Sequence, residues 1–207
     1  RNGAAGSLGC ACCRRYLRYG NAIEMSWSLR KLFGRAPFDI AVRQSYIATV
    51  EQARQPEFYE RWSVPDSAIG RFDVISLHCF LVLHRLKGEA SAQKFSEAYC
   101  ETLFDDMDRN LREMGVGDLS VGKKVRKMAE GFFGRAAAYE NALDEGEDRL
   151  HEVLQRNLFA EADPGDVVLR RLADYVRRNV GVLAEQEISA LIEGRIEFAP
   201  LIPETDR

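Results

Sequence analysis

The sequence has no apolar stretch long enough to cross a membrane. Its most hydrophobic segment, Phe72–Leu86, falls well short of the roughly 20 apolar residues that a spanning helix needs, and two histidines and an arginine interrupt it. On a helical wheel this segment has one broad and one narrower apolar arc, separated by thin polar seams. A helix that is apolar on two sides packs on two sides. We therefore expect Phe72–Leu86 to be a buried central helix.

The sequence also lacks the period-two alternation of strands, internal repeats and low-complexity tracts. Its 207 residues, 46% of them apolar and 29% charged, are typical of a soluble globular protein. The expected fold is all-α: a single compact multi-helix domain around the buried central helix, with no significant sheet. Proline, glycine and capping residues place the expected helices at 38–55, 57–62, 72–86, 91–114, 120–143, 147–159, 164–186 and 187–193. The expected caps are Ser91, Asp163, and either Asp66 or Ser67 at the start of the helix that leads into 72–86.

Four regions are expected along the chain. Residues 1–24 differ in composition from the rest of the chain and lack the apolar core of a signal sequence, so we interpret them as a disordered or non-native extension, with Met25 as the natural start. Residues 25–37 form a short basic segment that carries aromatic side chains. Residues 38–198 form the helical domain, and residues 199–207 a flexible tail.

Neither charge nor cysteine content indicates a special class of protein. The net charge of −3 gives the whole molecule no attraction to nucleic acid, so any anion binding needs a local patch. The five cysteines are an odd number, and Cys10, Cys12 and Cys13 are too close together for a known zinc spacing. We expect a reducing compartment and no disulfide framework.

Catalytic signatures are missing as well. The sequence has no nucleophile elbow, phosphate-binding glycine loop, zinc spacing or dinucleotide fingerprint, and the 115–118 segment is too short and too poor in glycine to bind phosphate. We therefore expect no enzyme activity, no metal site and no cofactor. One alternative remains open: His78 or His84 could bind haem or serve an enzyme with a partner from another helix. The favoured interpretation is a hydrogen-bonded core histidine.

An acidic cluster lies in the 91–114 helix. Asp105 with Arg109 and Asp108 with Arg112 have the four-residue spacing of ion pairs on a solvated helix face. Asp106 instead points towards the apolar arc. A carboxylate in that position should find a buried cation or a helix terminus.

A basic cluster opens the following helix, with four cations at Lys123, Lys124, Arg126 and Lys127. Cations are disfavoured at a helix N-terminus, so this run is either a solvated face or a docking patch for anionic lipid, ribosomal RNA or an acidic partner. Gly131 and Gly134 each disfavour the helix by roughly 1 kcal/mol, which suggests the close approach of another backbone.

Several strings in the chain, from about Phe38 to Leu183, resemble the ubiquinol–cytochrome c chaperone family. They are Trp62-x-Val64-Pro65-Asp66, Gly70-Arg71-Phe72-Asp73, Leu77-His78-x-Phe80-Leu81-Val82-Leu83, Leu103-Phe104-x-Asp106-Met107-Asp108-x-x-Leu111-Arg112-Glu113-x-Gly115-Val116-Gly117-Asp118, Gly122-Lys123-Lys124-Val125 and Phe133-Gly134-Arg135. Phe133 stands where the family pattern leads us to expect tyrosine. The resemblance implies an assembly chaperone for ubiquinol–cytochrome c reductase whose client is newly made cytochrome b.

The resemblance also implies partners and a location. The ribosome exit region and an anionic membrane surface are the further partners, and mitochondrial members of the family act with a small partner subunit. We expect a bacterial protein in the cytoplasm, peripheral to the inner membrane, with the matrix side of the mitochondrial inner membrane as the alternative. A peripheral membrane adaptor acting through Met25–Phe33 and the basic cluster is a competing function.

One partner-facing surface is predicted from the 115–118 turn, the basic cluster and the 132–135 segment. Its residues are Asp106, Arg112, Gly117, Asp118, Lys123, Lys124, Lys127, Phe132, Phe133, Gly134, Arg135 and Tyr139.

Overall fold

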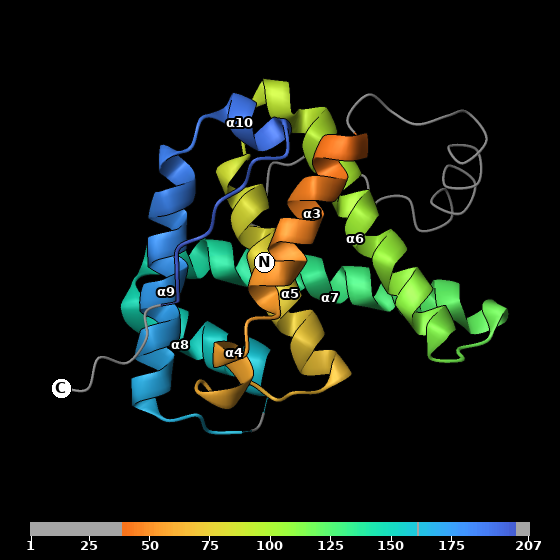
Figure 1. Ribbon diagram of the computed structural model, residues 1–207. Coiled ribbons are helices and arrows are strands. Elements are labelled where there is room, and N and C mark those ends of the chain that lie inside the picture. The colour runs from red at the N-terminus through yellow and green to blue at the C-terminus, as the bar shows by residue number, and fades with distance from the viewer. Residues whose placement is uncertain (1–38, 161, 202–207) are drawn as a thin grey trace, which may run out of the picture. The chain divides into compact units, whose positions relative to one another are not determined.

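The computed structural model describes residues 39–160 and 162–201, and within them it is helical with no strand, which confirms the all-α prediction (Figure 1). The extension at 1–24, the basic segment at 25–37 and the end of the predicted tail lie outside the described residues. None of the described helices combines the length and the apolarity needed to cross a membrane. In chain order the elements are α3 (Asp39–Ala53), α4 (Glu57–Glu60), α5 (Ala68–Arg85), η1 (Ala90–Ala92), α6 (Gln93–Glu113), α7 (Asp118–Glu145), α8 (Glu147–Leu154), η2 (Gln155–Phe159), α9 (Asp166–Glu185) and α10 (Ile188–Ile192).

The chain divides into two compact units, each assembled from separated stretches. Of the described residues, unit 1 contains 39–46, 86–137 and 188–195, and unit 2 contains 47–85, 138–160, 162–187 and 196–201. Two of the divisions, after Tyr46 and after Ala137, fall inside α3 and α7, so both helices contribute to each unit.

Helix α5 is the buried central helix that the sequence predicts, and it belongs to unit 2. Ser67 caps it, because its Oγ accepts a hydrogen bond from the Gly70 N–H at 3.1 Å. Between residues 73 and 82 nearly every side chain is buried, including the polar seam residues Asp73 and His78. The helix packs against α9 and η2. At its end, Arg85 donates to the carbonyl of Leu183 in α9 (2.8 Å) and to that of Gln186, which directly follows α9 (2.9 Å). That cation therefore caps the C-terminus of another helix.

Aromatic rings fill the core of unit 2 around α5. Phe58 lies 5.2 Å from Trp62 and 5.4 Å from both His78 and Tyr175, between ring centroids, in edge-to-face arrangements. His78 donates from Nδ1 to the Val74 carbonyl (2.8 Å), since a carbonyl can only accept, and Nε2 accepts from the Tyr175 hydroxyl (2.8 Å). Both ring nitrogens are thus occupied, as predicted for a core histidine, which counts against a ligand role. Burial lowers the pKa of His78 to about 4, because the buried ring disfavours the charged form.

Three local predictions differ from the structure. Ser91 lies within η1 and Ala92 precedes α6 with no side-chain cap, while Asp163 accepts from the Gly165 N–H in a turn before α9 and does not cap it. The α-helix predicted over 147–159 ends at Leu154. The chain continues as one turn of π-helix, η2, in which Leu158 and Phe159 are both buried.

The predicted tail also begins too early. Ala199 is buried, and its N–H donates to Asn179 Oδ1 at 2.9 Å. Residues 196–201 run beside α9 as an extended strap within unit 2 (Figure 1).

Candidate partner-binding surface

The turn between α6 and α7, in unit 1, is fixed by backbone and side-chain bonds. Gly115 takes a left-handed conformation (φ +81°), and the N–H groups of Gly115 and Val116 donate to the carbonyls of Arg112 and Leu111 (2.9 and 3.0 Å). These two bonds form a Schellman motif, which satisfies carbonyls at the end of α6. The Gly117 carbonyl then accepts from the Ser120 N–H at 2.9 Å and starts α7. The turn therefore has a single defined geometry.

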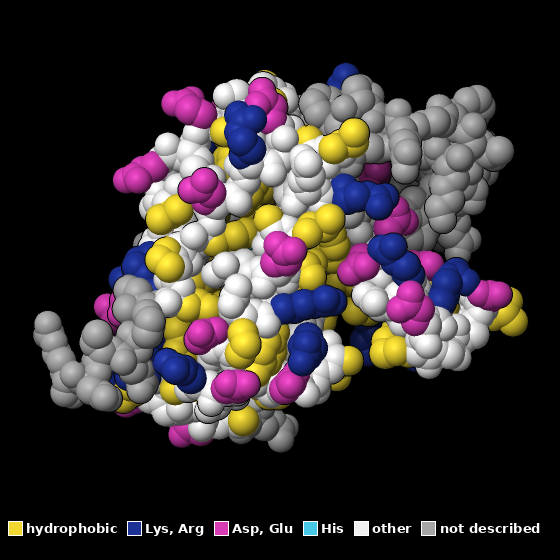
Figure 2. All heavy atoms as spheres, viewed as in Figure 1, with side chains coloured by type: hydrophobic (Ala, Val, Ile, Leu, Met, Phe, Trp, Pro, Cys, Tyr) yellow, Lys and Arg dark blue, Asp and Glu magenta, His cyan; other side chains and the backbone are white. Residues whose placement is uncertain are grey.

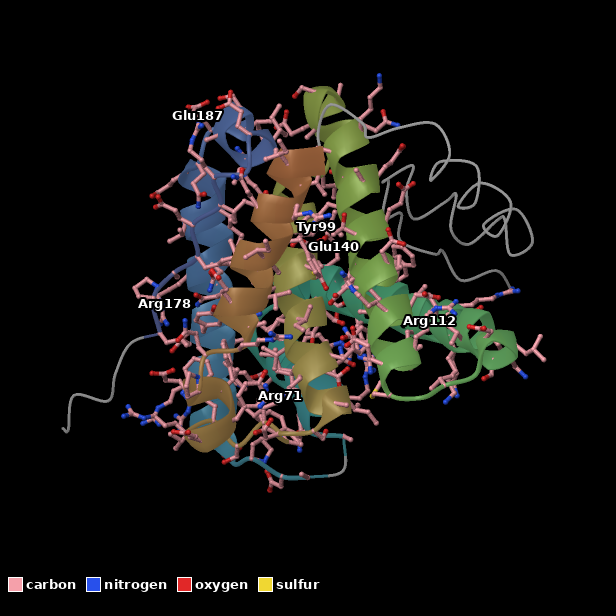
Figure 3. All side chains as sticks on the ribbon, turned by 45° about the vertical axis from the view of Figure 1, so that its right-hand side comes forward. Arg71, Tyr99, Arg112, Glu140, Arg178 and Glu187 are labelled. Atoms are coloured by element: carbon pink, nitrogen blue, oxygen red, sulfur yellow. The ribbon has the colours of Figure 1, made fainter. Side chains whose placement is uncertain are left out.

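Arg112 joins the last turn of α6 to the start of α7. Its side chain is labelled in Figure 3. The Arg112 Nε donates to Asp108 Oδ2 at 2.6 Å, which confirms the predicted pair, and its Nη1 donates to Asp118 Oδ1. Asp118 is the first residue of α7, where a negative charge interacts favourably with the helix dipole. Arg112 and Asp118, predicted as partner contacts, thus have an internal role first: they hold the turn.

Asp106 joins α6 to α3 within unit 1. Its carboxylate accepts hydrogen bonds from the Tyr46 hydroxyl (2.9 Å), Arg109 Nη2 (2.9 Å) and Asn110 Nδ2 (3.2 Å). The predicted buried cation is therefore replaced by a tyrosine from a helix 60 residues away in sequence, with Arg109 on the same helix as the cationic partner. Asp106 is half-buried and has a structural role.

Replacing Asp106 with alanine is expected to lower the free energy of unfolding by about 1–3 kcal/mol, because it leaves the Tyr46 hydroxyl without its acceptor. Urea denaturation followed by circular dichroism measures this. In a double-mutant cycle with Tyr46→Phe we expect a coupling energy of about 1 kcal/mol. A stable Asp106→Ala variant that has lost partner binding would instead make Asp106 a contact residue.

The predicted aromatic part of the surface is buried. Phe132 and Phe133 are almost inaccessible, and Phe104 lies 5.9 Å from each of them between ring centroids. Tyr139 is fully buried in unit 2, with its ring 5.4 Å from Phe80. Phe132, Phe133 and Tyr139 are core residues in this structure and cannot meet a partner from the surface. The buried arc of α7 is wide enough to include Phe133, which the narrower predicted stripe leaves out.

The basic part of the surface is exposed. Lys123, Lys124 and Lys127 are all exposed, and none forms an ion pair with a described residue, whereas Arg126 pairs with Glu130 at 3.2 Å. Because α7 begins at Asp118 and not near residue 120, these lysines fall in its second and third turns. The helix dipole fades beyond the first turn, so the expected destabilisation by these cations is small. Arg135 is half-buried beside Gly131.

Gly134 lies on the same face of α7 as Lys123 and Lys127, at helical spacing. It is exposed, and a Cβ built on it would meet no described atom within 4 Å. The close backbone approach predicted from this glycine is therefore absent among the described residues, and no described atom fills the space beside it.

Two apolar residues at the turn are missed by the sequence patterns. Met114 is 61% exposed and Leu119 is fully exposed (104%), and hydrophobic side chains show at this turn beside mixed charges (Figure 2). The signal is Leu119 itself, an apolar residue between Asp118 and Ser120 that lies off the buried stripe of α7. We call Met114, Leu119, Lys123, Lys124, Lys127 and Gly134 the α6–α7 surface.

An exposed apolar turn followed by lysines that pair with no described carboxylate is suited to holding another molecule. Within the described residues, no group of three or more His, Cys, Asp or Glu side chains could hold a metal ion. A helical fold with an exposed turn that combines apolar and basic side chains is typical of proteins that bind other macromolecules.

Comparison with known proteins places the chain in a family. The family model described as ubiquinol-cytochrome C chaperone matches residues 60–198, so the chain belongs to this family, which consists of assembly factors and is not catalytic. It is 34% identical to the protein in the crystal structure of the Cbp3 homolog from Brucella abortus, with a TM-score of 0.72, covering 86% of this chain and 97% of that one.

Two similar proteins of established name are also assembly factors of this kind. The ubiquinol-cytochrome-c reductase complex assembly factor 1 of Xenopus laevis is 28% identical over 165 residues, 79% of this chain and 82% of that protein. The factor of the same name from Homo sapiens is 25% identical over 165 residues, and there the chain spans only 55% of the relative's length.

Proposed function

We propose that this chain binds newly made cytochrome b and thereby assists the assembly of ubiquinol–cytochrome c reductase. The observation that carries the proposal is the α6–α7 surface, where three lysines without an acidic partner in the described part of the chain follow an exposed methionine and leucine. Family membership supplies the assembly role, and the surface supplies a means of holding a client. In a bacterium this action belongs at the cytoplasmic face of the inner membrane.

The chemistry of the surface suits a membrane protein during synthesis. Leu119 and Met114 can contact an apolar client segment, while Lys123 and Lys127 pair with acidic residues that flank it. Apolar anchors surrounded by charges give both affinity and fast encounter. Gly134 leaves room on the same helix for a client backbone to approach α7.

The test is to replace Lys123, Lys124 and Lys127 together with glutamate and to measure the affinity for cytochrome b during its synthesis. We expect a loss of at least about tenfold, since three favourable charge interactions become repulsive. Stability should change little, because all three side chains are exposed. The matched control replaces three other exposed cations, Arg43, Lys94 and Arg170, with glutamate. This control variant should retain binding to cytochrome b. Equal losses in both variants would contradict the proposal.

The exposed Leu119 favours a second candidate, an adaptor for an anionic membrane surface. An apolar side chain that enters the headgroup region, next to lysines that attract anionic lipid, would anchor the chain. The polyanionic ribosome exit region could use the same lysines. Flotation of the two triple variants with vesicles of phosphatidylglycerol and phosphatidylcholine separates the candidates: salt-sensitive flotation lost only in the α7 variant supports the membrane role.

A further inference from the structure

In unit 2, three side-chain amides hold the strap by its backbone. Gln186 binds both sides of one residue: the Glu197 N–H donates to its Oε1 at 3.0 Å, and its Nε2 donates to the Glu197 carbonyl at 2.7 Å. The Ala199 N–H donates to Asn179 Oδ1 (2.9 Å), and the Ala199 carbonyl accepts from Gln52 Nε2 (3.4 Å). We call Gln52, Asn179 and Gln186 the amide track.

The two amides that lie on α9 and at its end are held in fixed orientations by that helix. Asn179 Nδ2 donates to the Tyr175 carbonyl at 2.8 Å, and Gln186 Nε2 also donates to the Val182 carbonyl at 3.0 Å. Each amide oxygen therefore faces the strap already oriented for an incoming N–H. Such a preorganised site loses little entropy when a peptide binds.

The amide track has little specificity for the amino-acid sequence of the strap. Its four hydrogen bonds go to the N–H and carbonyl groups of residues 197 and 199, which any extended chain other than one with proline at these positions presents. Side-chain preference is confined to the buried Ile196 and Ala199 and to Phe198, whose ring lies 5.4 Å from His78. Glu197 and Pro200 are exposed. The requirement is an extended segment with an apolar residue, an aromatic residue two positions on and a small residue three positions on.

We propose that the amide track is a binding site for an extended polypeptide segment, that residues 196–201 are its resident occupant, and that an extended segment of the client exchanges with them. The inference rests on the proposed function only in naming the client as the source of that segment. The strap is tethered and competes at an effective concentration in the millimolar range, so a free peptide displaces it poorly. A client held elsewhere on the chain also presents its segments at raised local concentration, and can compete.

The experiment uses the full chain with Ala199→Lys. A lysine cannot be buried in the place of Ala199 without a partner, so the strap leaves and the track opens. A fluorescent peptide with the sequence of residues 195–201 should bind this variant at least about tenfold more tightly than it binds the wild type, by fluorescence anisotropy. Adding Gln186→Leu should abolish the binding. A peptide methylated on the nitrogen of residue 199 cannot donate to Asn179 and should bind at least about tenfold more weakly. No binding to a folded Ala199→Lys variant, or equal binding of the methylated peptide, overturns the proposal.

Hydrogen exchange in the wild-type chain tests the same idea without a variant. The amide hydrogens of Glu197 and Ala199 should exchange at least about 100-fold faster than those of Leu172 and Val176 in α9, because the strap opens while the helices remain folded. Exchange at the same rate would mean that the strap leaves only on unfolding, which overturns the proposal. Peptide binding needs no cytochrome b, so a chain that binds the peptide but not cytochrome b refutes the proposed function and leaves the amide track standing.

Discussion

Replacing Gly70 with alanine should lower the free energy of unfolding by about 3 kcal/mol or more, the largest loss we expect from any single methyl group. A Cβ at Gly70 would lie 2.0 Å from the Pro65 carbonyl oxygen and 3.0 Å from its carbon. That carbonyl cannot move freely, because it also accepts the Ser67 N–H at 2.9 Å. The chain therefore reaches α5 by passing so close to its first turn that only glycine fits. Either the turn at Pro65 or the cap at Ser67 must be disrupted.

The control is Gly181→Ala, the same substitution in the same unit. Gly181 is exposed in α9, and a Cβ added there would meet no described atom within 4 Å, so alanine should stabilise the helix by up to about 1 kcal/mol. Urea denaturation midpoints at neutral pH give both values. If the urea midpoint rises for Gly70→Ala as well as for Gly181→Ala, the Pro65 carbonyl does not lie as close to Gly70 as the structure shows.

Acid should destabilise unit 2 through His78. Its pKa is about 4 in the folded chain, against about 6.5 when unfolded, because burial disfavours the charged form of the ring. Between these values the unfolded chain binds more protons than the folded one, so stability falls as pH falls. The part of the free energy of unfolding that depends on neutral His78 is fully present above pH 6.5 and is lost progressively as the pH falls towards 4. The total loss is about 3 kcal/mol.

The variant His78→Gln isolates this effect, since other titrating groups are common to both proteins. Wild type should be the more stable at pH 7.5, and its advantage should shrink by about 3 kcal/mol between pH 7 and pH 4. Denaturation at several pH values measures the difference. An advantage that does not change with pH would place the pKa of the folded His78 at its ordinary value.

The local parts of this structure could be predicted from the sequence. The apolar arcs of α5 and α6 follow from three- and four-residue spacing, which is fixed by helix geometry. The Asp108–Arg112 pair follows in the same way. A cap at Asp66 or Ser67 follows from the residue types that favour a helix start, and the structure selects Ser67. The 115–118 turn is recognisable from its glycines, although α7 begins a little earlier than predicted because Gly117 can provide its first carbonyl.

The remaining features depend on residues far apart in the sequence. Tyr46 with Asp106, Arg85 with the end of α9, and Gln186 with Glu197 join separate elements, and no local pattern encodes such pairs. The prediction of the candidate surface is partly wrong for the same reason: whether Phe133 is buried depends on Phe104, which lies on another helix. The exposed Leu119 escapes prediction because an isolated apolar residue on a polar face carries no periodic signal.

We propose that the α6–α7 surface binds cytochrome b while cytochrome b is being synthesised. The direct measurement places a photo-crosslinking amino acid at residue 119 of the full chain and, in a second protein, at the exposed position 170 of α9, and illuminates each during synthesis of cytochrome b. We expect a covalent adduct with cytochrome b from position 119 and none from position 170. An adduct from position 170 alone, or none from position 119 in a folded chain, would contradict the account.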